Sequence, residues 1–184
     1  MVAPAGTERL FVALDLPAPA RAALAAFRER ADPELWRPVP DEALHVTLVF
    51  IGHRPAGDAE RVAAVVRACA GPADDLVLGP GLLLPPRRAR VLCAEVRDGS
   101  GALAGLQGRL ARELAAAGLH EPEKRPFRPH ATVARLRARQ RPPRSVPPDG
   151  PEPVAFAGES VTLYRSRLSP GGARYEPLER VAIG

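Results

Sequence analysis

The sequence predicts a bilobal α+β fold with two antiparallel-rich sheets and helices on their outer sides. Three observations support this prediction. Segments typical of strands and of helices follow one another along the 184 residues, and several strands come in succession in the second half. No Gly-rich phosphate-binding loop follows a predicted strand, so a parallel, doubly wound sheet is not required. An apolar run containing His-x-Thr occurs twice, about half a chain length apart, which indicates two similar lobes.

The first half of the chain has the pattern of two strands, each followed by a helix. Pro17 and Pro19 end the first apolar run and open an Ala-rich helix. Gly71 and Pro72 close the second helix. The expected elements are a strand over 9–15, a helix to about 31, a loop over 36–42, a strand over 44–51 that ends at Gly52, and a helix over 58–70.

The second half contains more strands than helices. Leucines at helical spacing mark its one helix, for which Ser100 is the expected N-cap. Six prolines between 140 and 153 predict a surface loop. The expected elements are short strands over 76–78 and 81–84, a strand over 90–96, a helix over about 101–118, a strand over about 127–136, and strands over 160–167 and 174–181 around a turn at 169–172.

The two His-x-Thr strings are the candidate source of chemistry. His45 and Thr47 lie in an apolar run over 44–50, and His130 and Thr132 lie in a second run, 85 positions later. Residues two apart on a strand leave from the same face, so each His shares a face with its Thr. On the first strand, strict alternation assigns the opposite, core face to Leu44, Val46, Leu48 and Phe50.

A single His of this kind is more often a core residue with satisfied hydrogen bonds than a catalytic group. Two occurrences in matching contexts favour a shared cleft with one imidazole from each lobe. Two facing imidazoles supply an acid and a base near neutral pH, because an unperturbed His titrates at about 6.5. The residues alone do not assign which His is the acid and which is the base.

The residues around both motifs match a known family over essentially the whole chain. The matching segments are 9–14, Trp36 ahead of 44–48 and 50–52, 125–135, and 163–168 with Gly172 and Tyr175. In these segments the sequence closely resembles the 2H phosphoesterases, and within them the RNA 2',3'-cyclic phosphodiesterases, once called 2'-5' RNA ligases. The resemblance implies one domain over 1–184 made of two intimately packed lobes, related by a pseudo-twofold, whose His-x-Thr strands face each other across a cleft.

The resemblance also implies an activity that uses neither metal nor cofactor. It is the hydrolysis of RNA 2',3'-cyclic phosphate ends to 2'-phosphates, with His45 as proton donor to the 3'-oxygen and His130 as proton acceptor from water. Thr47 and Thr132 can donate hydrogen bonds to the non-bridging phosphate oxygens.

Three further residues are expected to bind the substrate, namely Phe11, Arg128 and Arg135. Arg135 matches the family position that holds the nucleotide, and Phe11 can stack a base against it or belong to the core. Strict alternation puts Arg135 opposite to His130, unless the strand bulges or ends after Val133.

Two alternatives stay open at this point. One is a 2H enzyme that acts on another small cyclic phosphate, such as ADP-ribose cyclic phosphate, with the same chemistry. The other is a non-catalytic RNA-binding module, against which the intact His and Thr residues argue. The expected ligand in every case is RNA with a 2',3'-cyclic phosphate end or a small cyclic nucleotide.

The charge of the chain is unevenly distributed. The formal net charge is +5, and of the 26 basic residues only Lys124 is a lysine. The segment 124–144 has eight basic residues and no acidic one, so it is either a phosphate-attracting rim or a solvated loop. The Arg-rich total by itself matches the codon usage of a GC-rich genome.

The remaining features indicate a cytoplasmic protein, which we also expect to be a monomer. Cys69 and Cys93 lie in apolar surroundings and are expected to be buried free thiols, as in a reducing compartment. No apolar run approaches the length of a membrane span, and no signal sequence is apparent. His53 and His120 are expected on loops. A zinc site formed by His45, His53, Cys93 and His130 is disfavoured, because no close ligand pair such as Cys-x-x-Cys is present.

Overall fold

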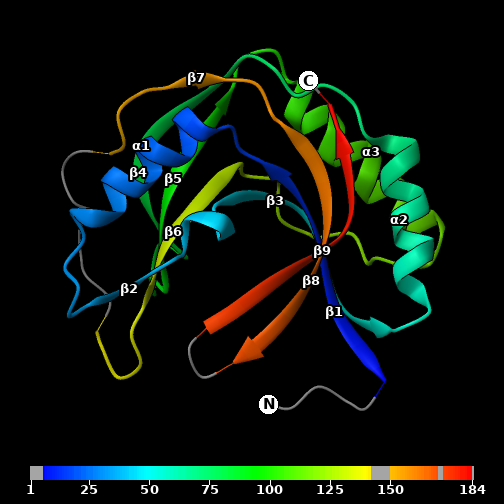
Figure 1. Cartoon of the computed structure of the whole chain (residues 1–184), viewed down its shortest axis with the longest axis horizontal. Coiled ribbons are helices and arrows are strands. Elements are labelled where there is room, and N and C mark those ends of the chain that lie inside the picture. The colour runs from blue at the N-terminus through cyan, green and yellow to red at the C-terminus, as the bar shows by residue number, and fades with distance from the viewer. Residues whose placement is uncertain (1–5, 142–149, 170–171, 184) are drawn as a thin grey trace.

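The computed structural model describes residues 6–141, 150–169 and 172–183, whose strands form one strongly curled sheet (Figure 1). All strand pairs in this part of the chain are antiparallel. The described ranges also contain three α-helices, which pack against the sheet. The predicted α+β class with antiparallel strands and outer helices is therefore confirmed.

The sheet runs in the order β7-β4-β5-β6-β3-β1-β8-β9, with β2 paired to β6 off this path. The strands are β1 (Thr7–Asp15), β2 (Trp36–Pro38), β3 (His45–Pro55), β4 (Leu76–Leu84), β5 (Val91–Asp98), β6 (His130–Leu136), β7 (Ala155–Phe156), β8 (Ser160–Ser169) and β9 (Gly172–Ala182). One half of the sheet ends at β6 and the other begins at β3, so each half carries one His-x-Thr strand at its inner edge. The two predicted sheets are joined into one by the contact between these strands.

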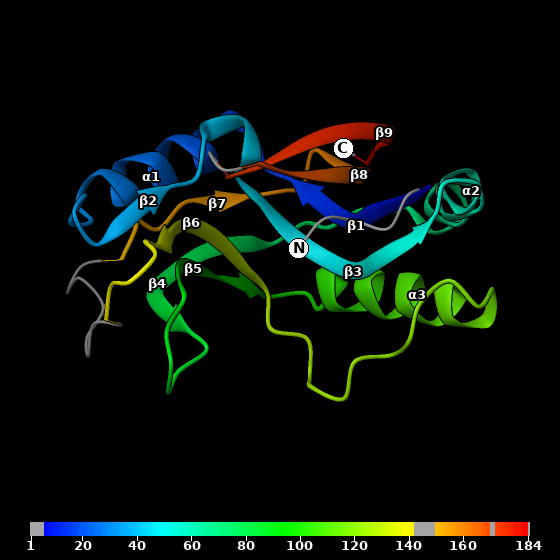
Figure 2. The same ribbon diagram turned by 90° about the horizontal axis from the view of Figure 1, so that it is seen from below.

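The helices tie the two halves together. They are α1 (Ala18–Glu29), α2 (Asp58–Cys69) and α3 (Ala102–Ala116), with a short 3-10 turn at Asp41–Ala43. Figure 2 shows α1 over the half that contains β2 and β6, and α2 and α3 at the other end, where α3 contacts β3. Each helix buries an apolar stripe, such as Leu103, Leu106, Leu110 and Leu114 of α3, which are fully buried.

The contact between β3 and β6 is short. Within the described residues, these strands share a single pair, Val46 with Ala131. Each of these residues lies between the His and the Thr of its motif, so the two motifs are side by side at the centre of the sheet. Beyond this pair the strands separate, and each continues its pairing with a different neighbour.

A β-bulge interrupts β3 directly after Thr47. The register against β1 skips Leu48, which reverses the alternation of faces for the residues that follow. Phe50 therefore lies opposite Phe11 on the cleft face, and 41% of it is exposed. The prediction that Phe50 belongs to the core is wrong, because it assumed an unbroken alternation.

A matching bulge occurs in β6, directly after Thr132. The register against β5 skips Val133, and the bulge returns Arg135 to the face that carries Thr132. Of the two ways in which Arg135 could reach the cleft, the structure adopts the bulge. The fifth residue after the motif His is thus turned into the cleft in both halves, as Phe50 in β3 and as Arg135 in β6.

Two segments expected to be irregular are strands. Residues 36–38 form β2 because they pair with β6 on the edge opposite β5, beyond the contact with β3, and Trp36 is buried there. β3 continues past Gly52, which has a positive φ of 83°, so His53 lies on a strand paired with Arg9 and not on a loop. The prediction for His120 is confirmed, since it follows α3 in a loop.

Other boundaries differ by a few residues. The expected strands over 76–78 and 81–84 form one strand, β4, with a register irregularity between them. β6 begins at His130, three residues later than predicted. The N-cap of α3 is Gly101, with a φ of 76°, although Oγ of Ser100 still accepts a hydrogen bond from the Ala102 amide. Most of the proline-rich segment and the centre of the predicted turn at 169–172 lie outside the described residues.

Candidate active site

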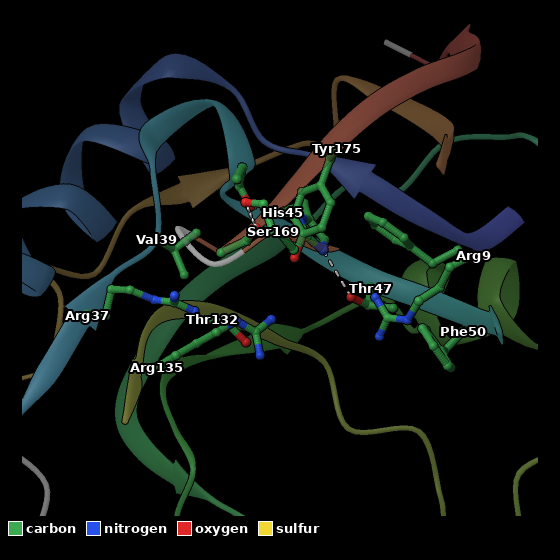
Figure 3. A pocket seen from close by; sticks show the side chains of 14 residues that line it. Arg9, Arg37, Val39, His45, Thr47, Phe50, Thr132, Arg135, Ser169 and Tyr175 are labelled. Atoms are coloured by element: carbon green, nitrogen blue, oxygen red, sulfur yellow. Dashed lines mark hydrogen bonds between the residues drawn. The ribbon is translucent and has the colours of Figure 1, made fainter. Parts of the chain in front are cut away.

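A central pocket of about 400 Å³ lies where the two motif strands meet. Five residues predicted from the sequence line it, namely Phe11, His45, Thr47, Thr132 and Arg135. Its further lining includes Arg9, Arg37, Phe50 and Tyr175, which the sequence did not identify as site residues. Figure 3 shows Arg37, Thr132 and Arg135 on one wall, and Arg9, Thr47 and Phe50 on the facing wall.

His45 is held at both ring nitrogens. Nδ1 lies 2.8 Å from the carbonyl oxygen of Ala43, and Nε2 lies 3.1 Å from Oγ1 of Thr47. A carbonyl oxygen only accepts, so Nδ1 carries a hydrogen and donates it, which fixes the tautomer of the neutral ring. Nε2 then accepts from the Thr47 hydroxyl, and this is the nitrogen that remains for proton transfer.

Aromatic rings surround His45. The ring centroids of Phe11 and Tyr175 lie 5.1 and 5.4 Å from that of the imidazole. Burial lowers the pKa of His45 to about 4, although the backbone hydrogen bond to Ala43 and the charge of Asp15 act in the opposite direction. In the unliganded protein at neutral pH, His45 is therefore neutral.

His130 repeats the backbone contact of His45. Its Nδ1 lies 2.7 Å from the carbonyl oxygen of Arg128, again two residues before the His, so Nε2 is free for proton transfer. The two motifs meet at the Val46–Ala131 pair, so the two histidines lie on adjacent strands. His130 borders a second cavity, which Arg128 also lines, while Arg135 and Thr132 line the central pocket.

Thr132 has a sulfur neighbour. Its Oγ1 lies 3.6 Å from Sγ of Cys93 on β5. Burial raises the pKa of Cys93 to about 11, so this thiol is neutral at physiological pH and is neither a nucleophile nor a thiolate ligand. Cys69 and Cys93 are both buried and free, as predicted.

Three arginines give the central pocket a positive charge. Arg135 comes from β6, Arg37 from β2 and Arg9 from β1. Among the described residues, none of the three forms an ion pair with a carboxylate. The guanidinium of Arg9 instead donates to Oγ of Ser166 and lies 4.6 Å from the ring centroid of Phe50. Such unpaired guanidinium groups suit an anionic ligand, onto which they can donate two hydrogen bonds each.

Phe11 is more buried than a residue that stacks on a base needs to be. Only 4% of it is exposed, and its ring stacks on Tyr164 with a centroid distance of 5.3 Å. It forms the floor of the central pocket beneath His45. Tyr175, edge-on to Phe11, is the partly exposed ring on this side.

A buried carboxylate network lies behind His45. Asp15 pairs with His45 across β1 and β3, and it accepts hydrogen bonds from the hydroxyl groups of Ser160, Thr162 and Tyr164 at 2.7–2.8 Å. Burial, followed by the charge of Asp15, raises the pKa of Tyr164 to about 12, so its phenol stays protonated and donates. No local signal in the sequence indicates this network, because three of its members lie on β8, about 145 residues from Asp15.

Two kinds of feature are absent from the residues that the structure describes. No group of three or more His, Cys, Asp or Glu side chains in these ranges is arranged to hold a metal ion. No helix among them is long and apolar enough to span a membrane.

Comparisons with known proteins match nearly the whole chain. The sequence profile of the 2'-5' RNA ligase superfamily matches residues 16–169. An RNA 2',3'-cyclic phosphodiesterase of Escherichia coli (strain K12) is 33% identical over 178 residues, which cover 96% of this chain and 97% of the relative. One of Thermus thermophilus is 34% identical over 190 residues, with 95% and 90% coverage.

Solved structures agree with this assignment. The crystal structure of E. coli LigT complexed with 3'-AMP superposes with a TM-score of 0.79 and 30% identity over 96% of this chain and 98% of that chain. A crystal structure described as a phosphoesterase gives a TM-score of 0.80 and 30% identity over 96% and 98% of the two chains. These findings confirm the resemblance drawn from the two His-x-Thr motifs, and the chain belongs to the 2'-5' RNA ligase superfamily.

Proposed function

We propose that this protein hydrolyses RNA 2',3'-cyclic phosphate ends to 2'-phosphates by paired-histidine acid/base catalysis. The observation that supports the proposal is the Val46–Ala131 pair, which sets the two His-x-Thr motifs side by side, with His45 lining the central pocket and His130 the cavity next to it. The relatives named RNA 2',3'-cyclic phosphodiesterase support the substrate class, since they match nearly the whole chain.

The reaction requires two proton transfers on opposite sides of phosphorus. Water attacks phosphorus and loses a proton to one imidazole, while the bond to the 3'-oxygen breaks and that oxygen receives a proton from the other. Each transfer contributes about 10²- to 10⁴-fold to the rate. The product carries a 2'-phosphate and a free 3'-hydroxyl.

We assign His45 as the donor to the 3'-oxygen and His130 as the acceptor from water. Because the pKa of free His45 is about 4, it must take up its proton together with the substrate. The phosphate anion next to Nε2 favours the protonated ring, as does the buried charge of Asp15. Thr47 and Thr132 donate hydrogen bonds to the non-bridging oxygens as negative charge develops.

The nucleotide occupies the remainder of the central pocket. Arg135 binds its phosphate or base edge, and Arg128 binds phosphate next to His130. Phe11 supports the base from the floor of the pocket. The free, buried cysteines suit the reducing cytoplasm, where we place the protein, and we expect it to act as a monomer.

Product analysis tests the proposal. An RNA oligonucleotide ending in a 2',3'-cyclic phosphate should be converted to the 2'-phosphate, as resolved by ³¹P NMR, and 2',3'-cAMP should give adenosine 2'-phosphate. Turnover of ADP-ribose cyclic phosphate in strong preference to both would move the assignment to another 2H substrate. Binding of the oligonucleotide without turnover of any of the three would leave an RNA-binding module.

A further inference from the structure

A second cavity, larger than the central pocket, opens where β3 and β6 separate. It has a volume of about 1150 Å³, and we call it the wedge cavity. Its lining includes the bulged part of β3 from Thr47 to Phe50, the chain over 125–128 with His130, and the end of β4 with the following prolines. The helix α3 contributes Gln107 and Arg112. The geometry follows from the single β3–β6 pair, because two strands that part after one contact leave a gap between them.

The wedge cavity is lined by four arginines, Arg90, Arg112, Arg125 and Arg128. Within the described ranges, none of them forms an ion pair, whereas arginines elsewhere, such as Arg54 and Arg67, are paired with carboxylates. Among the described residues that line the cavity, Glu123 is the one carboxylate. The cavity therefore has an excess of positive charge, as a groove for a polyanion requires.

The wedge cavity is continuous with the reaction centre. Thr47 and Phe50 line both cavities, and His130 lies on the wedge side. Phe50 is the one large hydrophobic side chain that is exposed among the described residues, and the guanidinium of Arg9 covers one face of its ring. An exposed aromatic ring next to unpaired arginines is the arrangement that binds single-stranded nucleic acid, because bases stack on the ring while the backbone follows the positive charge.

We propose that the wedge cavity binds the single-stranded RNA that precedes the reacting end, with Arg112 and Arg125 on its backbone phosphates and Phe50 stacking a base at the boundary between the cavities. This inference rests on the proposed function, since it extends the same substrate. It also divides the basic segment 124–144. Arg125 and Arg128 line the wedge cavity and Arg135 the central pocket, Arg137, Arg139 and Arg141 line neither, and Arg144 lies outside the described residues.

The test uses two double variants that remove the same charge. Arg112→Gln/Arg125→Gln changes the wedge cavity. Arg109→Gln/Arg139→Gln is the matched control, because Arg109 lies one turn away on α3 and Arg139 in the same basic segment, both outside the two cavities. For an RNA hexanucleotide with a 2',3'-cyclic phosphate end, the wedge variant should raise KM about tenfold with kcat nearly unchanged. For the mononucleotide substrate 2',3'-cAMP, the same variant should leave both constants unchanged.

Equilibrium binding separates this inference from the proposed function. The dissociation constant of a fluorescent hexanucleotide that ends in a 2'-phosphate is measured against salt, without turnover. The wedge variant should lower the log–log salt slope by about 1.4, at about 0.7 for each single-strand phosphate contact, and the control should keep the wild-type slope. Equal slopes for the two double variants overturn the inference, even if 2',3'-cAMP is hydrolysed normally. A wild-type protein that binds RNA through the wedge cavity but hydrolyses neither substrate overturns the proposed function and supports the cavity.

A separate variant tests whether a base stacks on Phe50. Phe50→Leu keeps an apolar side chain of similar size but has no ring on which a base can stack. We expect about tenfold weaker binding of the hexanucleotide, because stacking contributes about 1–3 kcal/mol per base and 1.4 kcal/mol corresponds to a factor of ten. An affinity equal to that of the wild type would exclude Phe50 from the RNA site.

Discussion

The two motif strands β3 and β6 share a backbone design and differ in what surrounds it. In each, Nδ1 of the His donates to the carbonyl two residues earlier, and a bulge follows the Thr. In each, an acidic residue of the neighbouring strand faces the His, as Asp15 in one half and Glu95 in the other. The pseudo-twofold is therefore a property of the backbone and its hydrogen bonds.

The surroundings break this symmetry. His45 lies among Phe11, Tyr164 and Tyr175, and Asp15 behind it is buried with its oxygens satisfied. His130 opens to the wedge cavity, and Glu95 is partly exposed. One reaction needs an acid and a base, which two identical environments would not provide, because equivalent groups prefer the same protonation state. The duplicated strands therefore position the two histidines, and the residues around each strand, which are not duplicated, determine whether its His acts as acid or base.

The largest expected effect comes from removing either histidine. His45→Ala and His130→Ala should each lower kcat/KM for 2',3'-cAMP by about 10²-fold or more, because each removes one proton transfer. The double variant should lose less than the product of the two losses, since both residues serve one step. Circular dichroism should show both variants folded. A folded single variant with nearly wild-type activity would contradict the claim that both histidines transfer a proton in the reaction.

A substrate with a modified leaving group identifies which of the two histidines is the acid. A pH–rate profile reports the pair and not its members, so it does not separate the two roles. In a substrate with sulfur in place of the 3'-oxygen, the leaving thiolate needs no proton, because thiols ionise near pH 8.5. His45→Ala should then lose at least about tenfold less activity than with the oxygen substrate, whereas His130→Ala should lose the same. The reverse result would exchange the two roles.

Features that depend on neighbouring residues are predictable from this sequence, whereas features that depend on strand register are not. The His-x-Thr strings identified the residues that meet at the β3–β6 contact, because a two-residue period survives from His45 to Thr47. The same period failed for Phe50, since a bulge leaves no composition signal in an apolar run. Arg37 was missed because pairing of β2 with β6 is a tertiary event. The pairing of Asp15 with β8 is likewise long-range, and no spacing in the sequence predicts it.

The stability of the protein in acid reports the lowered pKa of His45, the His in the more buried surroundings. The pKa of His45 is about 4 in the folded protein, below the 6.5 of an unfolded His, so between these pH values the unfolded chain binds more protons. The free energy of unfolding should therefore fall as the pH is lowered from 6.5 to 4, by about 2–3 kcal/mol from this residue. His45→Gln lacks this contribution, and urea denaturation of both proteins across this range gives the difference. If the free energy of unfolding of the two proteins changed with pH in parallel, the lowered pKa of His45 would be contradicted. The same experiment with His130→Gln measures the contribution of His130.

The smallest expected effect is that of a chelator, and it tests whether the two histidines act on protons or on a metal. Each imidazole has its Nδ1 occupied by a backbone carbonyl, which leaves Nε2 for one further interaction, and both protonation states of that nitrogen are needed for proton transfer. Cys93, the nearest thiol to Thr132, has a pKa raised to about 11 by burial and therefore offers no thiolate at neutral pH. Turnover of 2',3'-cAMP should be the same before and after dialysis against EDTA. Loss of turnover that zinc restores would show that a bound metal activates the water. The different surroundings of His45 and His130 would then position two metal ligands instead of an acid and a base.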